Sequence, residues 1–177
     1  DMDVLASDRK GPRRGCLWIE NVDARKGEWK THRIGEVGRH EVMFLADRRD
    51  ARGRVSAIFV ADRARRVIVK HERVDADASA GIEWKTTIIP TPPAMGTGKS
   101  VDLGDIDLDG KIDMAISCEN AKDVSGVLWM TDDGKTAREI SGREGTKYDF
   151  VRLVDVDGDG DLDVITCEER ENLGVFW

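Results

Sequence analysis

The chain is poor in the residues that cross-link small secreted scaffolds or anchor proteins in membranes. Its three cysteines, Cys16, Cys118 and Cys167, are odd in number and do not look like a disulfide framework. No apolar run approaches the length of a membrane span, and no signal-peptide pattern is recognisable. We therefore expect cysteines that serve as small packing residues, and a chain without a membrane span.

Residues that commonly carry catalysis are also scarce. The chain has three histidines, His32, His40 and His71, and a single tyrosine, Tyr148, with no zinc-ligand spacing and no phosphate-binding loop. His40 precedes an expected strand near the rim of its unit and, with Tyr148, is the candidate for a catalytic base. The sequence favours a non-catalytic protein but leaves catalysis open.

Positive charge is in deficit and unevenly distributed. The net charge is −7, yet residues 1–89 carry 19 basic and 15 acidic side chains, whereas residues 90–177 carry 9 and 20. We expect no nucleic-acid partner, because the chain is acidic and no aromatic residue lies within the basic cluster of Arg63, Arg65 and Arg66. The basic half predicts either a mixed solvated surface or a patch for a polyanion such as a uronate-containing polysaccharide.

What the chain does have is two dense runs of aspartate, at residues 105–113 and 155–163. Both read D-x-D-x-D-G-x-x-D, with carboxylates at positions 1, 3, 5 and 9 and glycine at position 6. Four carboxylates in nine residues repel one another unless a cation lies among them, and Ca²⁺ accepts such a flexible oxygen shell. Gly110 and Gly160 allow the backbone to turn sharply around the ion. The sequence therefore predicts about two calcium sites.

These two runs have two other interpretations, an EF-hand loop and a turn without metal. An EF-hand loop needs a glutamate at position 12 and flanking helices, but Ile116 and Thr166 stand there. The segments that follow, 112–118 and 162–167, are short, apolar and rich in β-branched residues, which favours strands. The remaining alternative is a pair of solvated Asp-Gly turns that hold no metal.

The loops belong to a longer repeat. A loop, an apolar strand and a Gly-Val-x-Trp segment ending at Trp129 or Trp177 recur together, and the chain opens in the same pattern with Asp3 at the ninth loop position. A Trp-Lys-Thr segment at Trp29 recurs at Trp84. A period of roughly fifty residues filled with short strands is typical of a four-stranded propeller blade. We predict an all-β propeller in which the tryptophans pack in the core.

These loops, strands and Gly-Val-x-Trp segments resemble the FG-GAP/VCBS repeat family of β-propellers, which is also seen in integrin α-subunits. The resemblance is strong over residues 98–177 and weaker over 35–75, and it implies that the loops hold Ca²⁺. Side-chain ligands would come from the aspartates at loop positions 1, 3, 5 and 9, and a backbone carbonyl from position 7. The implied residues are Asp105, Asp107, Asp109, Lys111 and Asp113 in the first loop, and Asp155, Asp157, Asp159, Asp161 and Asp163 in the second.

In the second unit the corresponding loop has degenerated to residues 48–56. Only Asp50 and Gly53 keep their places, while Arg48 and Arg52 stand where carboxylates are needed. A guanidinium group cannot share a pocket with Ca²⁺, so we expect this unit to be free of metal. The arginines are predicted to pair with Asp50 or Asp47 instead.

The units approximately span 1–40, 41–95, 96–145 and 146–177 of one propeller region, about three and a half blades. Closed rings need at least four blades. Two expectations remain open: the chain is a piece of a larger propeller, or further copies of it complete the ring.

Two functions of different classes follow. The first is a non-catalytic, calcium-binding propeller module that presents a surface to a glycan or protein ligand. The second is the propeller portion of a carbohydrate-active enzyme, such as a polysaccharide lyase acting on uronate-containing glycans. Calcium loops of modest affinity fill only where calcium is plentiful, so we expect a secreted or periplasmic protein.

Overall fold

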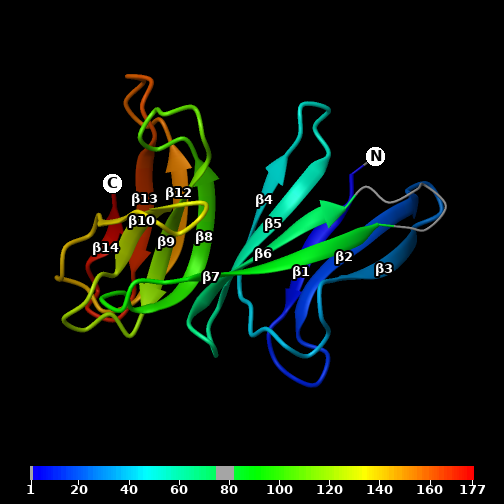
Figure 1. Ribbon diagram of the computed structural model, residues 1–177, viewed down its shortest axis with the longest axis horizontal. Coiled ribbons are helices and arrows are strands. Elements are labelled where there is room, and N and C mark those ends of the chain that lie inside the picture. Colours follow the sequence, from blue (N-terminus) through cyan, green and yellow to red (C-terminus); the bar gives the residue numbers. More distant parts are fainter. Residues whose placement is uncertain (1, 75–81) are drawn as a thin grey trace.

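The computed structural model describes residues 2–74 and 82–177, and in these residues every regular element is a β-strand. The strands form four antiparallel sheets, each made of strands consecutive in the chain (Figure 1). The first sheet contains β1 (Val4–Asp8), β2 (Gly15–Asp23) and β3 (Glu28–Ile34). The second contains β4 (Leu45–Arg49), β5 (Val55–Asp62), β6 (Val67–Val74) and β7 (Glu83–Pro90).

The other two sheets follow in the same manner. The third contains β8 (Thr97–Gly104), β9 (Asp113–Glu119), β10 (Val127–Thr131) and β11 (Ala137–Glu139). The fourth contains β12 (Tyr148–Val154), β13 (Asp163–Glu168) and β14 (Gly174–Phe176). Figure 1 shows the first two sheets on one side of the molecule and the last two on the other. The all-β prediction is confirmed, and the sheets have the form of propeller blades, although the described residues do not close into a ring.

Each sheet packs face to face against the next, which buries the apolar side of the strands. Ile34 and Val60 meet between the first two sheets, Phe59 and Ile116 lie in the core between the second and third, and Val127 packs near Val151 between the third and fourth. The central strands β5 and β9 are buried on both faces, and each contains a run of consecutive apolar residues, 57–61 and 114–116, rather than an alternating pattern. These three cores fix the ends of the strands from which the aspartate loops project.

The tryptophans only partly follow the prediction that they pack in the core. Trp18 and Trp84 are half-buried against the core between the first two sheets. Trp29 and Trp177 are 50% and 68% exposed, so the prediction is wrong for these two. Trp29 lies on β3, an edge strand, and Trp177 follows the edge strand β14, where no further sheet covers the ring in this structure.

The three cysteines are free thiols. Cys16 and Cys118 are buried, and burial raises the pKa of each thiol to about 12, which leaves both as neutral packing residues. Cys167 is half-buried. Among the described residues there is no helix that could cross a membrane.

Candidate metal sites

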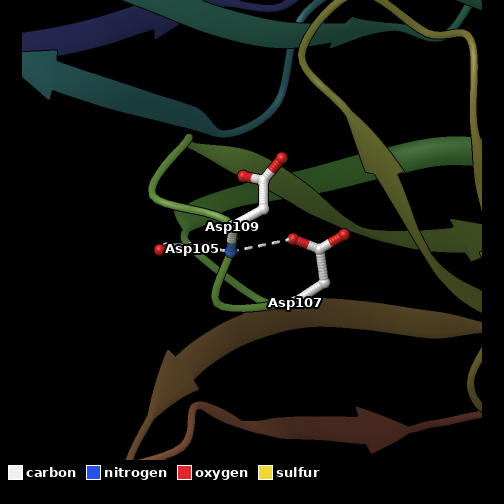
Figure 2. Close-up of side chains that lie close together, drawn as sticks. All are labelled: Asp105, Asp107 and Asp109. Atoms are coloured by element: carbon white, nitrogen blue, oxygen red, sulfur yellow. Dashed lines mark hydrogen bonds between the residues drawn. The ribbon is translucent and has the colours of Figure 1, made fainter.

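The first aspartate loop connects β8 to β9 and is organised by its own carboxylates. Asp105 accepts hydrogen bonds from the backbone N–H groups of Asp109 and Gly110, at 3.0 and 2.9 Å. Asp107 accepts the Asp109 N–H at 3.3 Å, and Asp109 accepts the Lys111 N–H at 2.9 Å. Figure 2 shows Asp105, Asp107 and Asp109 projecting from this one turn, with the bond between Asp107 and the Asp109 N–H dashed. The backbone therefore wraps around a group of carboxylates.

The second loop, between β12 and β13, repeats this pattern. Asp155 accepts the N–H of Gly160 at 3.1 Å, as Asp105 accepts that of Gly110. Asp157 accepts the Asp159 N–H at 3.2 Å, and Asp159 accepts the Asp161 N–H at 3.0 Å. Two loops fifty residues apart thus share three of their hydrogen bonds, although the position-1 aspartate also accepts the Asp109 N–H in the first loop and the Gly158 N–H in the second.

The ninth-position aspartates begin the strands that leave the loops. Asp113 accepts the Ile106 N–H at 3.2 Å, and Asp163 accepts the Val156 N–H at 2.9 Å. In each loop the ninth-position carboxylate is thus bonded to the backbone of the second position. Burial raises the pKa of Asp113, and the negative charges of Asp107 and Asp109 raise it further. The hydrogen bond from the Ile106 N–H lowers this pKa but does not outweigh the other two effects. The effect of Asp107 and Asp109 is the repulsion among carboxylates that a bound cation would relieve.

The carboxylates at positions 1, 3 and 5 converge closely enough to share one ion. In each loop, one oxygen atom from each of the three aspartates lies within 4.8 Å of the others. An all-oxygen set of carboxylates is suited to a hard cation, and the residues present therefore fit a metal ion. Asp113 and Asp163 lie outside these groups of three. The involvement of these two, and of the carbonyls of Lys111 and Asp161, stays a prediction.

The two loops differ at positions 4 and 7. Leu108 adopts a φ of +58° in the first loop, where Gly158 has +81° in the second, so only the first loop bears the steric cost of a side chain in the left-handed region. Position 7 is Lys111 in the first loop, and its Nζ lies 2.5 Å from an Asp109 carboxylate oxygen. This hydrogen bond to Lys111 lowers the pKa of Asp109. The second loop has Asp161 at this position and is the more negative of the two.

In the degenerate loop between β4 and β5, arginine–aspartate pairs stand where the ion would bind. Asp50 accepts hydrogen bonds from the N–H groups of Arg52 and Arg54, both at 2.9 Å, and its carboxylate pairs with the Arg54 guanidinium. Arg49 pairs with Asp47 at 2.8 Å. The predicted pairing to Asp50 and Asp47 is thus present, but different arginines supply it.

Arg48, which was expected to take part in that pairing, points across the sheet instead. Its guanidinium lies 3.4 Å from a carboxylate oxygen of Glu72 and 3.6 Å from one of Asp132. Asp132 belongs to the next sheet's β10–β11 turn, so Arg48 links two sheets rather than filling the degenerate loop.

Both candidates for a catalytic base are buried. His40 is 1% exposed, and its Nδ1 lies 2.8 Å from the Asp62 carboxylate, so this side chain is closed to solvent. Tyr148 is 2% exposed and packs beside Phe176. Burial alone would raise the pKa of Asp62, but hydrogen bonds from His40 and from backbone N–H groups outweigh it and lower that pKa. No sequence pattern predicts the His40–Asp62 pair, because the two residues meet only in the folded sheet.

Four blade-like antiparallel sheets, the last two with an acidic turn between their first and second strands, define a β-repeat protein of the propeller-blade type. The sequence profile of the FG-GAP-like repeat matches residues 105–166, a segment that contains both aspartate loops and the strands β9 to β12. This segment therefore carries the FG-GAP-like repeat that the sequence predicted. A search of curated proteins found no match to the chain.

Proposed function

We propose that the chain is a calcium-binding β-propeller repeat module that is not itself catalytic and presents a surface to a glycan or protein ligand. The observation that carries the proposal is the repeated hydrogen-bond pattern of the two loops, each of which gathers three carboxylates on one turn. Repetition of this geometry in a segment with an FG-GAP-like repeat supports a common ligand for both loops. All-carboxylate coordination on a flexible turn favours Ca²⁺ over smaller or softer ions.

The ion's role in this proposal is structural. Asp105, Asp107 and Asp109 would hold one ion, and Asp155, Asp157 and Asp159 the other, with Asp113 and Asp163 as further ligands from the following strands. Bound calcium neutralises groups that otherwise repel one another, and it ties the β8–β9 and β12–β13 connections to their sheets. We further propose that the protein works outside the cytoplasm, where calcium is plentiful, and that the rest of a propeller or further copies of the chain complete the ring.

Chelation tests the calcium proposal directly. Adding EDTA is expected to lower the melting temperature, because an ion that binds only the folded state contributes about 2.7 kcal/mol at a hundredfold excess over its Kd. Asp107→Ala and Asp157→Ala should each abolish one of two calorimetric binding sites and part of the calcium-dependent rise in Tm. Asp123→Asn is a matched control, since Asp123 is exposed, lies outside both loops, and has a φ of +62° that asparagine also adopts. Unchanged Tm and no heat of calcium binding in the parent chain would refute the proposal.

The polysaccharide-lyase alternative is not preferred. His40 and Tyr148 are its candidate bases, and both are buried in this structure, His40 in a pair with Asp62. A general base has to reach a proton of the bound substrate, and neither side chain is open to a solvent-borne polysaccharide here.

A further inference from the structure

A pocket of about 390 Å³ opens between the first and second sheets, beside the degenerate loop. Its chemically distinctive lining consists of two tryptophans, three arginines and one aspartate: Trp18, Trp84, Arg49, Arg54, Arg73 and Asp3. Its volume is in the range of small-molecule sites, which start near 300 Å³. The sequence had assigned Trp18 and Trp84 to the core, and their convergence on a pocket could not be foreseen from positions so far apart in the chain.

The Trp18 ring is held in a fixed orientation at this pocket. Its Nε1–H donates a hydrogen bond of 2.8 Å to Asp3, whose other carboxylate oxygen accepts the Asn21 N–H at 2.9 Å. His32 stacks on the indole with ring centroids 4.3 Å apart and planes inclined by 20°. His32 thus covers one face of the indole and fixes the orientation of a ring that lines the pocket. Asp3 keeps its negative charge at this pocket, and the two N–H donors hold its carboxylate against Trp18 and Asn21.

The arginines around the pocket are also positioned in advance. Arg49 is paired with Asp47 and donates a hydrogen bond of 3.2 Å to the Gly53 carbonyl, while Arg54 is paired with Asp50. Arg73 lies directly across the β6–β7 ladder from Trp84, so a cation and an indole stand side by side. A guanidinium group has five N–H donors and can bind a second carboxylate while it keeps the first. Side chains that are already fixed lose less conformational entropy on binding.

From this combination we infer that the pocket binds an acidic sugar residue, a uronate, within an anionic glycan. The apolar C–H face of a pyranose ring packs on an indole, and a guanidinium fork binds the carboxylate at C6 through paired charge-assisted hydrogen bonds. Three guanidinium groups line the pocket, and a guanidinium that is already paired, as Arg49 is with Asp47, has further N–H donors for a sugar carboxylate, which favours an anionic over a neutral sugar. The inference deepens the glycan-binding part of the proposed function and rests on it, but it does not depend on calcium in the loops.

The pocket also explains what the second unit gained when its loop lost the carboxylates of a metal site. Arg49 and Arg54 come from that loop, and their aspartate partners Asp47 and Asp50 lie outside the pocket lining. A calcium loop at this position would have placed acidic groups next to the tryptophans and repelled a uronate. The arginine-rich loop places positive charge there instead.

The test titrates the 177-residue chain with α-1,4-linked trigalacturonate by calorimetry, with EDTA present so that calcium cannot bridge the sugar to the acidic loops. Neutral maltotriose and a short oligothymidylate serve as comparison ligands. Binding of trigalacturonate alone is expected. Equal binding of maltotriose, or binding of the oligothymidylate only, overturns the inference. The calcium titration contains no sugar and the sugar titration contains no free calcium. A negative result in one therefore refutes only the proposal that it tests.

Variants locate the binding site. Arg49→Gln and Arg73→Gln should each raise the Kd for trigalacturonate roughly tenfold, the effect of losing one hydrogen-bonded charge. Arg138→Gln is the matched control, because Arg138 lies over the Trp129 ring, 5.6 Å from its centroid, but outside the pocket. It should leave the Kd unchanged.

The indole N–H signals in NMR spectra give a second readout that does not depend on the stability of any variant. Those of Trp18 and Trp84 should shift on titration, while that of Trp129 stays in place. Unchanged affinity in both arginine variants, or shifts confined to Trp129 and Trp29, would overturn the assignment of the site.

Discussion

His71 provides a prediction that can be worked out quantitatively. The ring lies on β6, is 1% exposed, and meets the edge of the His40 ring with centroids 5.9 Å apart. Its Nδ1 lies 3.0 Å from the Thr86 hydroxyl, and its Nε2 is buried without a hydrogen-bond partner. Beyond His40 lies Asp62, which is bonded to His40 rather than to His71. A proton on His71 would therefore be buried next to a second imidazole with no carboxylate of its own.

Burial, together with the neighbouring His40, lowers the pKa of His71 from 6.5 to about 4. Between these two values the unfolded chain binds a proton that the folded chain does not, so stability falls as the pH drops from about 6.5 to about 4. At 1.36 kcal/mol for each pH unit, the full loss is about 3 kcal/mol. That is a large fraction of the 5–15 kcal/mol typical of a folded domain. Above pH 6.5 this group contributes no pH dependence.

The assay is urea unfolding, followed by circular dichroism, of the parent chain and His71→Asn between pH 7.5 and 4.5. Asparagine retains a polar group near the Nδ1 position for Thr86 but does not titrate in this range. The parent should lose most of the 3 kcal/mol over this interval relative to the variant, whatever the variant's absolute stability. EDTA in all samples removes the pH dependence of calcium binding, and His32→Asn, at the surface beside Glu20, serves as the control. If parent and His71→Asn curves run parallel, the burial argument is refuted.

Three further predictions concern the loops and the packing of the last two sheets. Lys111→Gln should raise the calcium affinity of its own loop, residues 105–113, several-fold, because it frees Asp109 from the Lys111 pair. Lys135→Gln breaks a similar pair outside the loops and should leave the affinity unchanged; calorimetry measures both. Leu108→Gly should stabilise the calcium-free chain by roughly 0.5–1 kcal/mol in urea unfolding, because it relieves a positive φ. A lower free energy of unfolding in this variant would contradict the argument that Leu108 is strained. Gly126→Ala should cost about 2 kcal/mol, since its Cβ would overlap the Tyr148 ring, and an unchanged Tm would contradict that packing.

Local structure was predictable from the sequence wherever the repeat was intact. The loops at residues 105–113 and 155–163 lie between first and second strands, as expected, because glycine and aspartate at fixed positions determine the turn whatever surrounds it. The same holds for the strand that starts at Asp113 and for the absence of helices among the described residues. These features depend on contacts within a few residues, which a sequence displays directly.

Features that depend on contacts between sheets were not predictable in this way. Trp29 repeats in sequence with Trp84, yet one is half-exposed and the other half-buried, because burial depends on which sheet lies opposite. The sequence predicted that His40 lies near the rim of its unit, but not its pair with Asp62, which forms only when β5 lies beside the segment preceding β4. A repeat pattern predicts the strand on which a side chain lies, but not what covers it.

The β4–β5, β8–β9 and β12–β13 loops show two physical solutions to the same backbone turn. In the loops at Asp105 and Asp155, carboxylates cap the turn through backbone N–H groups and leave oxygen atoms directed at a common point. In the loop at Asp50, a single carboxylate caps the turn and its charge is balanced by Arg54 from the same loop. In the proposed function the first solution takes its counter-charge from an ion in solution, whereas in the second the chain itself supplies the counter-charge. Dependence on calcium should therefore be confined to the last two sheets, while the first two, which form the tryptophan–arginine pocket, remain folded and able to bind an acidic sugar when calcium is scarce.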